Sequence, residues 1–140
     1  MCVSIRKMSI ADYHEIYRVW QECNIYISAS DREEEIKKFL EYNPLTSLVL
    51  IHNDKIIGGV LGGYDGRRGL VHHLCVAKEY RKKGYGKLLL EELEKLFLEL
   101  GVVKISFWVD NENLEVVDFY QKLDYSLRDD IVTMSKTLRH

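Results

Sequence analysis

The chain lacks the features that would divide it into parts. It contains a single proline, Pro44, no linker rich in proline, glycine or serine, and no internal repeat or low-complexity tract. At 140 residues it can bury about two thirds of the surface that its unfolded chain exposes, so its core needs no disulfide or metal to hold it together. These absences predict one folding unit, and we expect a single domain over residues 1–140.

Cysteines and long apolar runs are also scarce. Cys2, Cys23 and Cys75 form no C-x-x-C pair and are odd in number, which argues against a disulfide scaffold or a zinc site. No apolar run approaches the roughly 18 residues of a membrane-spanning helix, and the charged Arg6 and Lys7 follow closely on the N-terminus, so we expect no signal segment. The expectation is a soluble protein of the reducing cytoplasm, with no membrane partner and no metal.

Little excess charge of either sign is present. The net charge is −2, which gives no general reason to expect nucleic acid or an anionic membrane as a partner. Basic residues gather locally, in the segment Arg81-Lys82-Lys83-Gly84-Tyr85-Gly86. This segment follows the apolar run Leu74-Cys75-Val76 and opens an amphipathic stretch from Leu88 to Leu100. Three cations and two glycines therefore lie where a predicted strand gives way to a predicted helix.

Such a junction is suited to binding an anion. The first turn of a helix has N–H groups without an internal partner and carries a partial positive charge, and glycine lets a phosphate approach the backbone without meeting a Cβ. Other phosphate loops fit less well. A P-loop would need Ser or Thr after Lys87, where Leu88 stands, and the dinucleotide-binding fingerprint would need a third glycine at Leu89. An ordinary helix start with solvated charges is the remaining alternative.

Arg-x-x-Gly-x-Gly in this context resembles the acetyl-CoA pyrophosphate loop of the GNAT superfamily of acyl-CoA N-acyltransferases. The resemblance implies that Arg81 to Gly86, together with Lys87, hold the pyrophosphate of acetyl-CoA. It also implies that Leu74-Cys75-Val76 hold the pantetheine arm through main-chain hydrogen bonds, as if the arm were another strand. A nucleophilic role for Cys75 is the less favoured interpretation, because a free cysteine inside an apolar strand usually packs as a small hydrophobe.

A second motif near the C-terminus resembles the family's N-x-x-A-x-x-[FL]-Y-x-K-x-G-[FY] helix. Two positions depart from it: Val116 replaces the usual alanine, which narrows the space beside the cofactor, and Asp124 replaces glycine at the helix end. Aspartate tolerates a left-handed backbone better than most residues, so the turn can survive. The matching residues are Asn113, Phe119, Tyr120, Lys122 and Tyr125.

Tyr120 is the best candidate for the catalytic acid. An amine that attacks a thioester expels a thiolate, and the pKa of the corresponding thiol is about 8.5. A phenol with a pKa of about 10 can donate a proton to this thiolate. A plain core tyrosine is the alternative interpretation. Asn113 of the same motif either bonds the cofactor or caps its own helix.

The general base is less evident. Some family members place a glutamate on the strand before the phosphate loop, and the corresponding position here is Leu70. His72 lies two residues on, and strand alternation predicts that it shares a face with Leu70, Leu74 and Val76, whereas His73 shares the other face with Val71 and Cys75. His72 can titrate near neutrality and accept the proton of the amine. A structural histidine and a water chain to backbone carbonyls are the alternatives.

The apolar patterns predict the order β-α-α-β-β-β-α-β-α-β-β, which fits the GNAT arrangement. We therefore predict an α/β (mixed α+β) fold, with a central twisted mixed sheet of about six to seven strands and four flanking helices. The second helix is expected to start with a capping box at Ser30. The predicted strands are Val3–Arg6, Ser47–Ile51, Lys55–Gly62, Gly69–Val76, Val102–Val109, Tyr125–Leu127 and Ile131–Ser135, and the predicted helices run from Ser9 to about Cys23, from Ser30 to Asn43, from Leu88 to Leu100 and from Asn113 to Leu123.

The sequence thus predicts an acetyl-CoA-dependent N-acetyltransferase that transfers its acetyl group directly to a primary amine of a small molecule, peptide or protein. Trp20, Tyr26 and Tyr64 either line the acceptor pocket or merely pack, and a homodimer is left open. One alternative is a CoA-binding regulatory module without catalysis, which would not need Tyr120. The other is a nucleic-acid patch at the basic loop, which the net charge disfavours.

Overall fold

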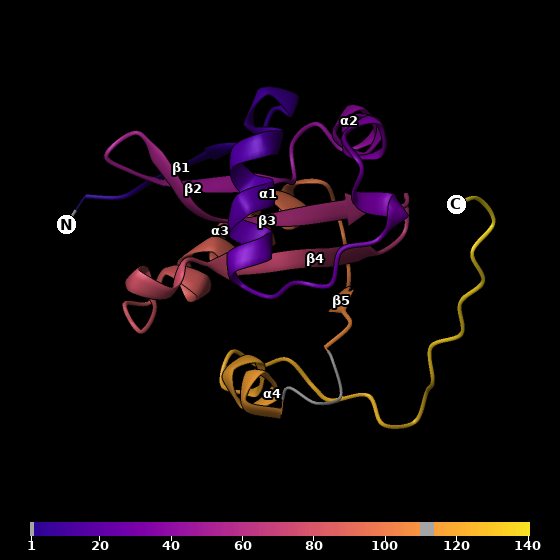
Figure 1. The fold of residues 1–140 in the computed structure, drawn as a ribbon. Coiled ribbons are helices and arrows are strands. Elements are labelled where there is room, and N and C mark those ends of the chain that lie inside the picture. Colours follow the sequence, from indigo (N-terminus) through magenta and orange to yellow (C-terminus); the bar gives the residue numbers. More distant parts are fainter. Residues whose placement is uncertain (1, 110–113) are drawn as a thin grey trace. The chain divides into compact units, whose positions relative to one another are not determined.

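A computed structural model describes residues 2–109 and 114–140 (Figure 1). The chain forms two compact units, of which the first ends at Phe107 and the second begins at Trp108. The first unit holds the whole sheet and the first three α-helices, and the second holds the fourth. The expectation of a single domain stays a prediction. Within the described residues, no helix is long and apolar enough to span a membrane.

The first unit is built on one mixed sheet in which neighbours in sequence are neighbours in space. The first four strands pair antiparallel, and the fourth pairs parallel with the fifth. The predicted hairpin is confirmed, because His52 pairs with Lys55 across a two-residue turn in which Asn53 and Asp54 both have positive φ. In order across the sheet the strands are β1 (Ser4–Lys7), β2 (Leu48–His52), β3 (Lys55–Tyr64), β4 (Gly69–Val76) and β5 (Ile105–Phe107).

The prediction of six to seven strands is wrong for the described residues, which contain five. Tyr125–Leu127 and Ile131–Ser135 form no strand, because alternation specifies a face but a strand also needs a partner. β5 is shorter than predicted at its start. The N–H of Val102 instead donates to the carbonyl of Phe97 at 3.0 Å and closes the end of α3 (Tyr85–Glu99), with Gly101 in the left-handed conformation.

Helices cover both faces of this sheet (Figure 1). The helices of the first unit are α1 (Tyr13–Glu22), α2 (Glu33–Tyr42) and α3 (Tyr85–Glu99). On the α1 and α2 side, Ile16, Trp20 and Ile36 pack in one core cluster with Leu61 and Cys75 of the sheet. On the other side, the space above Gly62 is filled by Leu93 and Phe97 of α3.

The start of α2 differs from the prediction. The capping box uses Ser28 and Asp31 rather than Ser30, because the Asp31 carboxylate accepts a hydrogen bond from the Ser28 N–H at 3.0 Å. These residues enclose a short 3-10 turn (η2, Ala29–Asp31), and α2 begins only at Glu33. Asp31 is thereby held, almost fully buried, beside the sheet.

A bulge interrupts β4. Gly59 of β3 pairs with Cys75 and Leu61 pairs with His72, so two residues of β4, His73 and Leu74, lie opposite one residue of β3. His73 absorbs the extra residue with a φ of 52°. The regular alternation along β4 therefore breaks at this point.

The bulge changes which residues share a face. Val71 pairs with Gly62, which faces α3, whereas Cys75 pairs with Gly59, which faces Ile16 of α1. The prediction that Val71 and Cys75 share a face is therefore wrong. The prediction that His72 shares a face with Leu74 and Val76 is also wrong, because His72 pairs with Leu61 on the α1 side, whereas Leu74 and Val76 flank Cys75 and face the other way. His73 nevertheless lies on the α1 side, as Cys75 does, because its ring contacts Trp20.

The second unit contains α4 (Leu114–Gln121). Asp124 has a φ of 70°, which confirms that aspartate can take the left-handed turn at the helix end. The turn is closed by a hydrogen bond of 3.1 Å from the Tyr125 N–H to the Tyr120 carbonyl. Asn113, the predicted start of this helix, lies outside the described residues.

Candidate active site

The predicted phosphate loop joins a short 3-10 turn (η3, Lys78–Tyr80) to α3. Lys82 and Gly84 both have positive φ, at 62° and 83°, so the chain reverses sharply before the helix begins at Tyr85. A Cβ placed on Gly84 would meet no atom within 4 Å, which leaves open space in front of the backbone. Glycine is needed there for its left-handed conformation.

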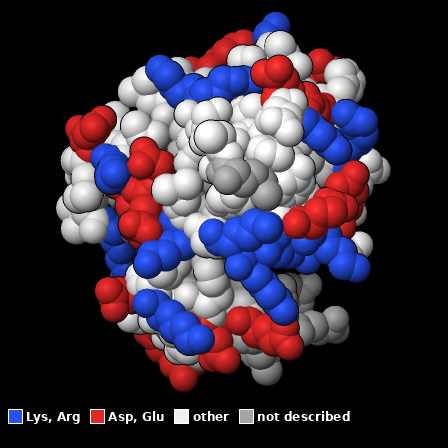
Figure 2. Space-filling model, turned by 90° about the vertical axis from the view of Figure 1, so that its left-hand side faces the viewer, with Lys and Arg blue, Asp and Glu red and all other residues white. Residues whose placement is uncertain are grey.

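The loop carries backbone donors and exposed cations. The first helical hydrogen bond of α3 runs from the Leu88 N–H to the Gly84 carbonyl, so the amides of Gly86 and Lys87 have no partner inside the helix. Lys82, Lys83 and Lys87 are exposed, and none of them forms an ion pair with another residue in the described part of the chain. Figure 2 views the side of the molecule on which this loop lies in Figure 1 and shows a band of Lys and Arg side chains across it.

Arg81 has a different place from the lysines. Its Nε donates a hydrogen bond of 2.9 Å to the carbonyl of Val76, the last residue of β4. The same carbonyl lies 3.4 Å from the Sγ of Cys23, which follows α1. Arg81 thus ties the phosphate loop to the strand predicted to hold pantetheine.

The edge of β4 that faces β5 is paired at its start and unpaired by any described strand at its end. β5 pairs only with Gly69, Leu70 and Val71, and no strand among the described residues pairs with that edge from Leu74 to Val76. An extended ligand could add to the sheet there through main-chain hydrogen bonds. This geometry suits the role predicted for Leu74-Cys75-Val76, although the Val76 carbonyl already accepts hydrogen bonds.

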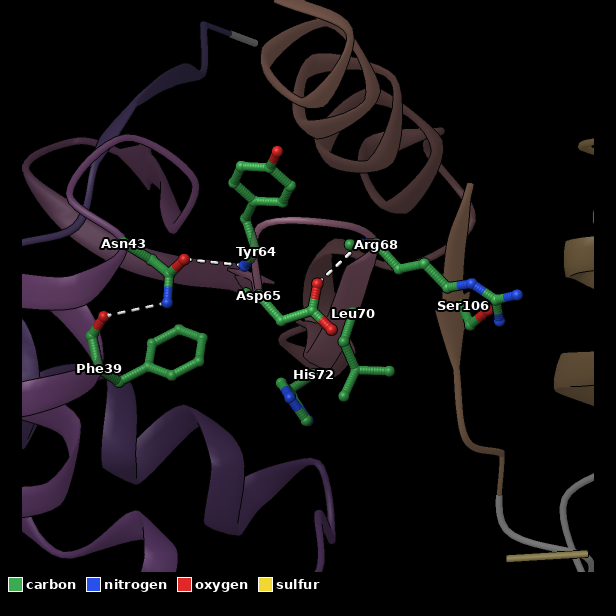
Figure 3. Close-up of a pocket in the computed structure, with 10 residues that line it drawn as sticks. Phe39, Asn43, Tyr64, Asp65, Arg68, Leu70, His72 and Ser106 are labelled. Carbon is green, nitrogen blue, oxygen red and sulfur yellow. Dashed lines mark hydrogen bonds between the residues drawn. The ribbon is translucent and has the colours of Figure 1, made fainter. Parts of the chain in front are cut away.

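A cavity of about 410 Å³ opens where α2, the β3–β4 turn and the start of β5 meet (Figure 3). The side chain of Asn43 braces its wall through two hydrogen bonds. The amide of Asn43 accepts a hydrogen bond from the Tyr64 N–H at 2.8 Å and donates one to the Phe39 carbonyl at 3.4 Å. The lining residues are Phe39, Asn43, Gly63, Tyr64, Asp65, Arg68, Gly69, Leu70, His72 and Ser106.

Opposite charges lie at the rim of this cavity. Oδ1 of Asp65 accepts hydrogen bonds of 2.7 Å from the N–H groups of Arg67 and Arg68. The bond from Arg68, followed by that from Arg67, lowers the pKa of Asp65, so this residue is a carboxylate at neutral pH. The Arg68 side chain extends toward Ser106 (Figure 3).

His72 is the histidine that lines the cavity. Its imidazole is half-buried and meets the Phe39 ring edge-on, with 6.0 Å between ring centroids. Burial, and then the neighbouring His73, lower the pKa of His72, while Asp31 acts weakly in the other direction. The ring is therefore neutral at pH 7, which is the form that can accept a proton.

His73 is fixed away from the lining. Its Nε2 lies 2.8 Å from Oδ1 of Asp31, and its ring packs edge-on against Trp20 at 4.8 Å between centroids. The two adjacent histidines thus differ in environment, and His72 is the one that faces the cavity.

The remaining candidate residues lie in different parts of the structure. Of the three aromatic residues considered for the acceptor pocket, Tyr64 lines the cavity, Trp20 is fully buried in the core and Tyr26 is exposed. Tyr120 lies on α4 of the second unit, with its ring 5.2 Å from that of Phe119 and 6.0 Å from that of Tyr125. Within the described residues, no three His, Cys, Asp or Glu side chains gather as metal ligands would.

Comparison with known proteins decides the family. A model described as the acetyltransferase (GNAT) family matches residues 13–125. The chain belongs to this family. It is 35% identical over 130 residues to an acetyltransferase of Yersinia pestis (strain Pestoides F), with 93% of this chain and 92% of the relative covered. It is 32% identical over 136 residues to the acetyltransferase SG1711 of Sodalis glossinidius, with coverage of 97% and 96%.

Solved structures show the same fold. The PaiA N-acetyltransferase of Thermoplasma acidophilum in complex with coenzyme A is similar with a TM-score of 0.81 and 23% identity, covering 92% of each chain. The aminoglycoside acetyltransferase HMB0005 from an uncultured soil metagenomic sample has a TM-score of 0.73 and 18% identity, covering 99% of this chain and 100% of that one.

Family membership settles the predicted reaction class. The protein is an acetyl-CoA-dependent N-acetyltransferase with a mixed α+β GNAT fold, and acetyl-CoA is its acyl donor. The predicted enzyme, fold class and cofactor are thereby confirmed, and the non-catalytic alternative is set aside.

Several cavity residues cannot be recognised in the sequence. Phe39 lies on the apolar face of α2, which is typical of a core residue, and Asn43 indicates only a helix stop before proline. Asp65 and Arg68 lie in and beside the glycine-rich turn, where no pattern distinguishes them as pocket residues. The signal available for Asp65 is its place before Gly66, where aspartate typically accepts hydrogen bonds from the backbone of its own turn.

Proposed function

We propose that the protein acetylates a primary amine bound in the cavity around His72, by direct transfer from acetyl-CoA. The observation that carries this proposal is a histidine with a lowered pKa that lines a cavity on the strand predicted to hold pantetheine. A base placed there would act at the point where the thioester is expected. Direct transfer needs no covalent enzyme intermediate, and the buried Cys75 is not required as a nucleophile.

Acetyl-CoA would be held by the phosphate loop and the end of β4, both of which belong to the first unit. In this proposal Lys82, Lys83 and Lys87, with the amides at the start of α3, bind the pyrophosphate. Main-chain groups from Leu74 to Val76 hold the pantetheine. Arg81 acts as a brace between the two through its hydrogen bond to Val76, rather than as a freely placed phosphate ligand.

The proton would leave through His72. An amine with a pKa of about 10.4 is neutral in about one molecule in 2,500 at pH 7, which corresponds to about 4.6 kcal/mol. The neutral imidazole takes the proton that the nitrogen loses as it attacks the thioester carbonyl. The carbon–sulfur bond then breaks, and Tyr120 gives a proton to the departing thiolate. The assignment of Tyr120 rests on the motif of its helix.

The rim charges favour a particular acceptor. Asp65 is an ionised carboxylate that suits the ammonium form of an arriving amine, and Arg68 suits an anionic group on the same molecule. We therefore propose a small acceptor, or the end of a peptide, that carries both a primary amine and a carboxylate or phosphate.

The two units are proposed to act as one acetyltransferase domain, because the family model runs across the boundary between them. We place this domain in the cytoplasm, where its three free cysteines would stay reduced.

An acetylation assay tests the proposal. Release of free CoA thiol from acetyl-CoA should be followed with matched pairs of amines that differ only in a carboxylate or phosphate, such as ethanolamine and phosphoethanolamine. We expect turnover with the anionic member of a pair, and Arg68→Gln should reduce the preference. Arg67→Gln is the matched control, because Arg67 is an exposed neighbour that does not line the cavity. Acetyl-CoA binding with no turnover across amines, peptides and polyamines would contradict the proposed function.

A further inference from the structure

We propose that Cys23 and Cys75 form a peroxide-sensitive thiol pair, in which hydroperoxides oxidise Cys23 and Cys75 closes the product into a disulfide that weakens acetyl-CoA binding. The chemistry of the pair stands apart from the proposed function. Its effect on binding rests on the proposed role of the phosphate loop.

The two thiols meet across the sheet. Cys23 directly follows α1 and packs against the core cluster that contains Cys75 of β4. Both side chains lie in the core on the α1 side of the sheet, and each thiol shifts the pKa of the other. Each sulfur also lies against a carbonyl, with Cys23 Sγ 3.4 Å from the Val76 oxygen and Cys75 Sγ 3.9 Å from the Gly59 oxygen. Both cysteines are reduced in this structure.

Cys23 has the properties of a reactive thiol. It is only partly buried, so small oxidants can reach it. The hydrogen bond from Cys75, and then the hydrogen bond and charge of Arg81, lower the pKa of Cys23 to about 6, against the opposing effects of burial and Glu22. The lowered pKa favours the thiolate of Cys23, which is the form that attacks peroxides.

Cys75 has the properties of the resolving partner. Its hydrogen bond with Cys23, together with burial, raises the pKa of Cys75 well above its ordinary value, so it keeps its proton. A buried thiol of this kind does not react with an oxidant in solution. Its side chain belongs to the core cluster against which Cys23 packs, on the side where the sulfenic acid would form.

The reaction balances with a hydroperoxide as the oxidant. The Cys23 thiolate attacks the peroxide, an S–O bond forms, the O–O bond breaks, and the leaving oxygen takes a proton from water. Cys23 sulfur is oxidised to the sulfenic acid and the peroxide is reduced to an alcohol or water. Cys75 sulfur then attacks Cys23 sulfur, the S–S bond forms, the S–O bond breaks, and the hydroxyl leaves as water with the Cys75 proton.

The consequence for the phosphate loop follows from a shared carbonyl. The Val76 oxygen lies within hydrogen-bond distance of both Cys23 Sγ and Arg81 Nε. A disulfide has no negative charge to hold the Arg81 guanidinium, which the Cys23 thiolate attracts. It also draws the two sulfurs to about 2.05 Å, which shifts the end of α1 against β4. We expect Arg81 to lose its hydrogen bond to the Val76 carbonyl, so that the phosphate loop is no longer held against the end of β4.

The chemical arm of the test uses the full chain. Reduced protein is treated with an equimolar amount of hydrogen peroxide, and linkages are read by mass spectrometry of its peptides. A Cys23–Cys75 disulfide is expected in the wild type and in Cys2→Ser, the matched control at an exposed cysteine. Cys75→Ala should instead leave a Cys23 sulfenic acid that dimedone traps. Dimedone labelling of Cys2 alone, or Cys23 and Cys75 that both stay alkylatable after peroxide, would overturn the proposal.

The binding arm measures acetyl-CoA affinity by calorimetry in reduced, oxidised and re-reduced protein. The loss of a charged hydrogen bond predicts about tenfold weaker binding in the oxidised form, with recovery after dithiothreitol. Cys23→Ser should show no change of affinity on peroxide treatment. A disulfide that forms with unchanged affinity would refute the link to the phosphate loop and leave the acetyltransferase activity untouched.

Discussion

Nε2 of His73 lies 2.8 Å from Oδ1 of Asp31, and this bond joins the bulge of β4 to the turn that precedes α2. It holds the backbone of His73 in its left-handed conformation, one residue from the ring that faces the cavity. The shape of the candidate acceptor site therefore depends on a buried pair that does not itself line it.

The Asp31–His73 pair should make the free energy of unfolding depend on pH. Burial alone would raise the pKa of Asp31, but hydrogen bonds from His73 and from the Ser28 N–H outweigh burial and lower it. A lowered folded-state pKa means that the carboxylate stabilises the fold above the unfolded value of about 3.9, and that this contribution is lost as the pH falls through the folded value. Asp31→Asn should cost about 1–3 kcal/mol in the free energy of unfolding at pH 7.

Urea unfolding at pH 7 and at about pH 3 measures this effect. The gap between wild type and Asp31→Asn should narrow at the lower pH, where the wild-type carboxylate begins to be protonated. The exposed Asp129→Asn is the control and should change little at either pH. An equal gap at both pH values would mean that the Asp31 carboxylate does not stabilise the fold.

The phosphate loop is testable through backbone conformation. Gly84→Val forces a branched residue to a φ of 83° and places a side chain in the space where a phosphate oxygen would approach. Lost charge-assisted hydrogen bonds are worth about 1.5–3 kcal/mol each, so acetyl-CoA affinity should fall at least about tenfold. Calorimetric titration with acetyl-CoA measures the change.

Gly101→Val is the control that separates the effect on acetyl-CoA binding from the effect of backbone strain. Gly101 has a φ of 81° and, as at Gly84, a Cβ added to it would meet no atom within 4 Å, but it follows the end of α3 instead of preceding its start. The variant should lose similar stability and keep acetyl-CoA affinity. Equal affinity in both variants would remove the phosphate-loop assignment.

Tyr120→Phe tests the proposed acid. The change keeps the ring that packs beside Phe119 and Tyr125 and removes the hydroxyl proton. A general acid typically contributes about 10²–10⁴ in rate, so kcat should fall by that factor with acetyl-CoA affinity nearly unchanged. The exposed Tyr42→Phe is the control. If Tyr120→Phe keeps more than about a third of wild-type kcat in a chemistry-limited assay, another group carries the proton.

Local patterns in the sequence predict the parts of this protein that depend on neighbouring residues. The phosphate loop is one of these, because its glycine and cation spacing directly reflects the backbone turn at Gly84. The hairpin at Asn53 and the left-handed Asp124 are others. Each depends on the conformation of one or two residues.

Features that depend on distant partners could not be predicted in this way. The bulge at His73 is fixed by pairing with β3 and by the bond to Asp31, and strand alternation carries no sign of either. Ile131–Ser135 has a strand-like composition but forms no strand, since composition does not supply a pairing partner. The cavity combines Phe39, Asp65 and Ser106 from three separate elements.

The pH dependence of turnover by His72→Gln tests the central claim most directly. Because burial lowers the pKa of His72, the wild-type rate should decline on the acid side only below the ordinary histidine value of about 6.5, as the imidazole gains a proton. His72→Gln should lose this limb, show its largest deficit near neutral pH, and partly recover at high pH, where the amine deprotonates unaided. His14→Gln, at a largely exposed histidine, should match wild type. A His72→Gln profile parallel to that of wild type at every pH would contradict the assignment of His72 as the base.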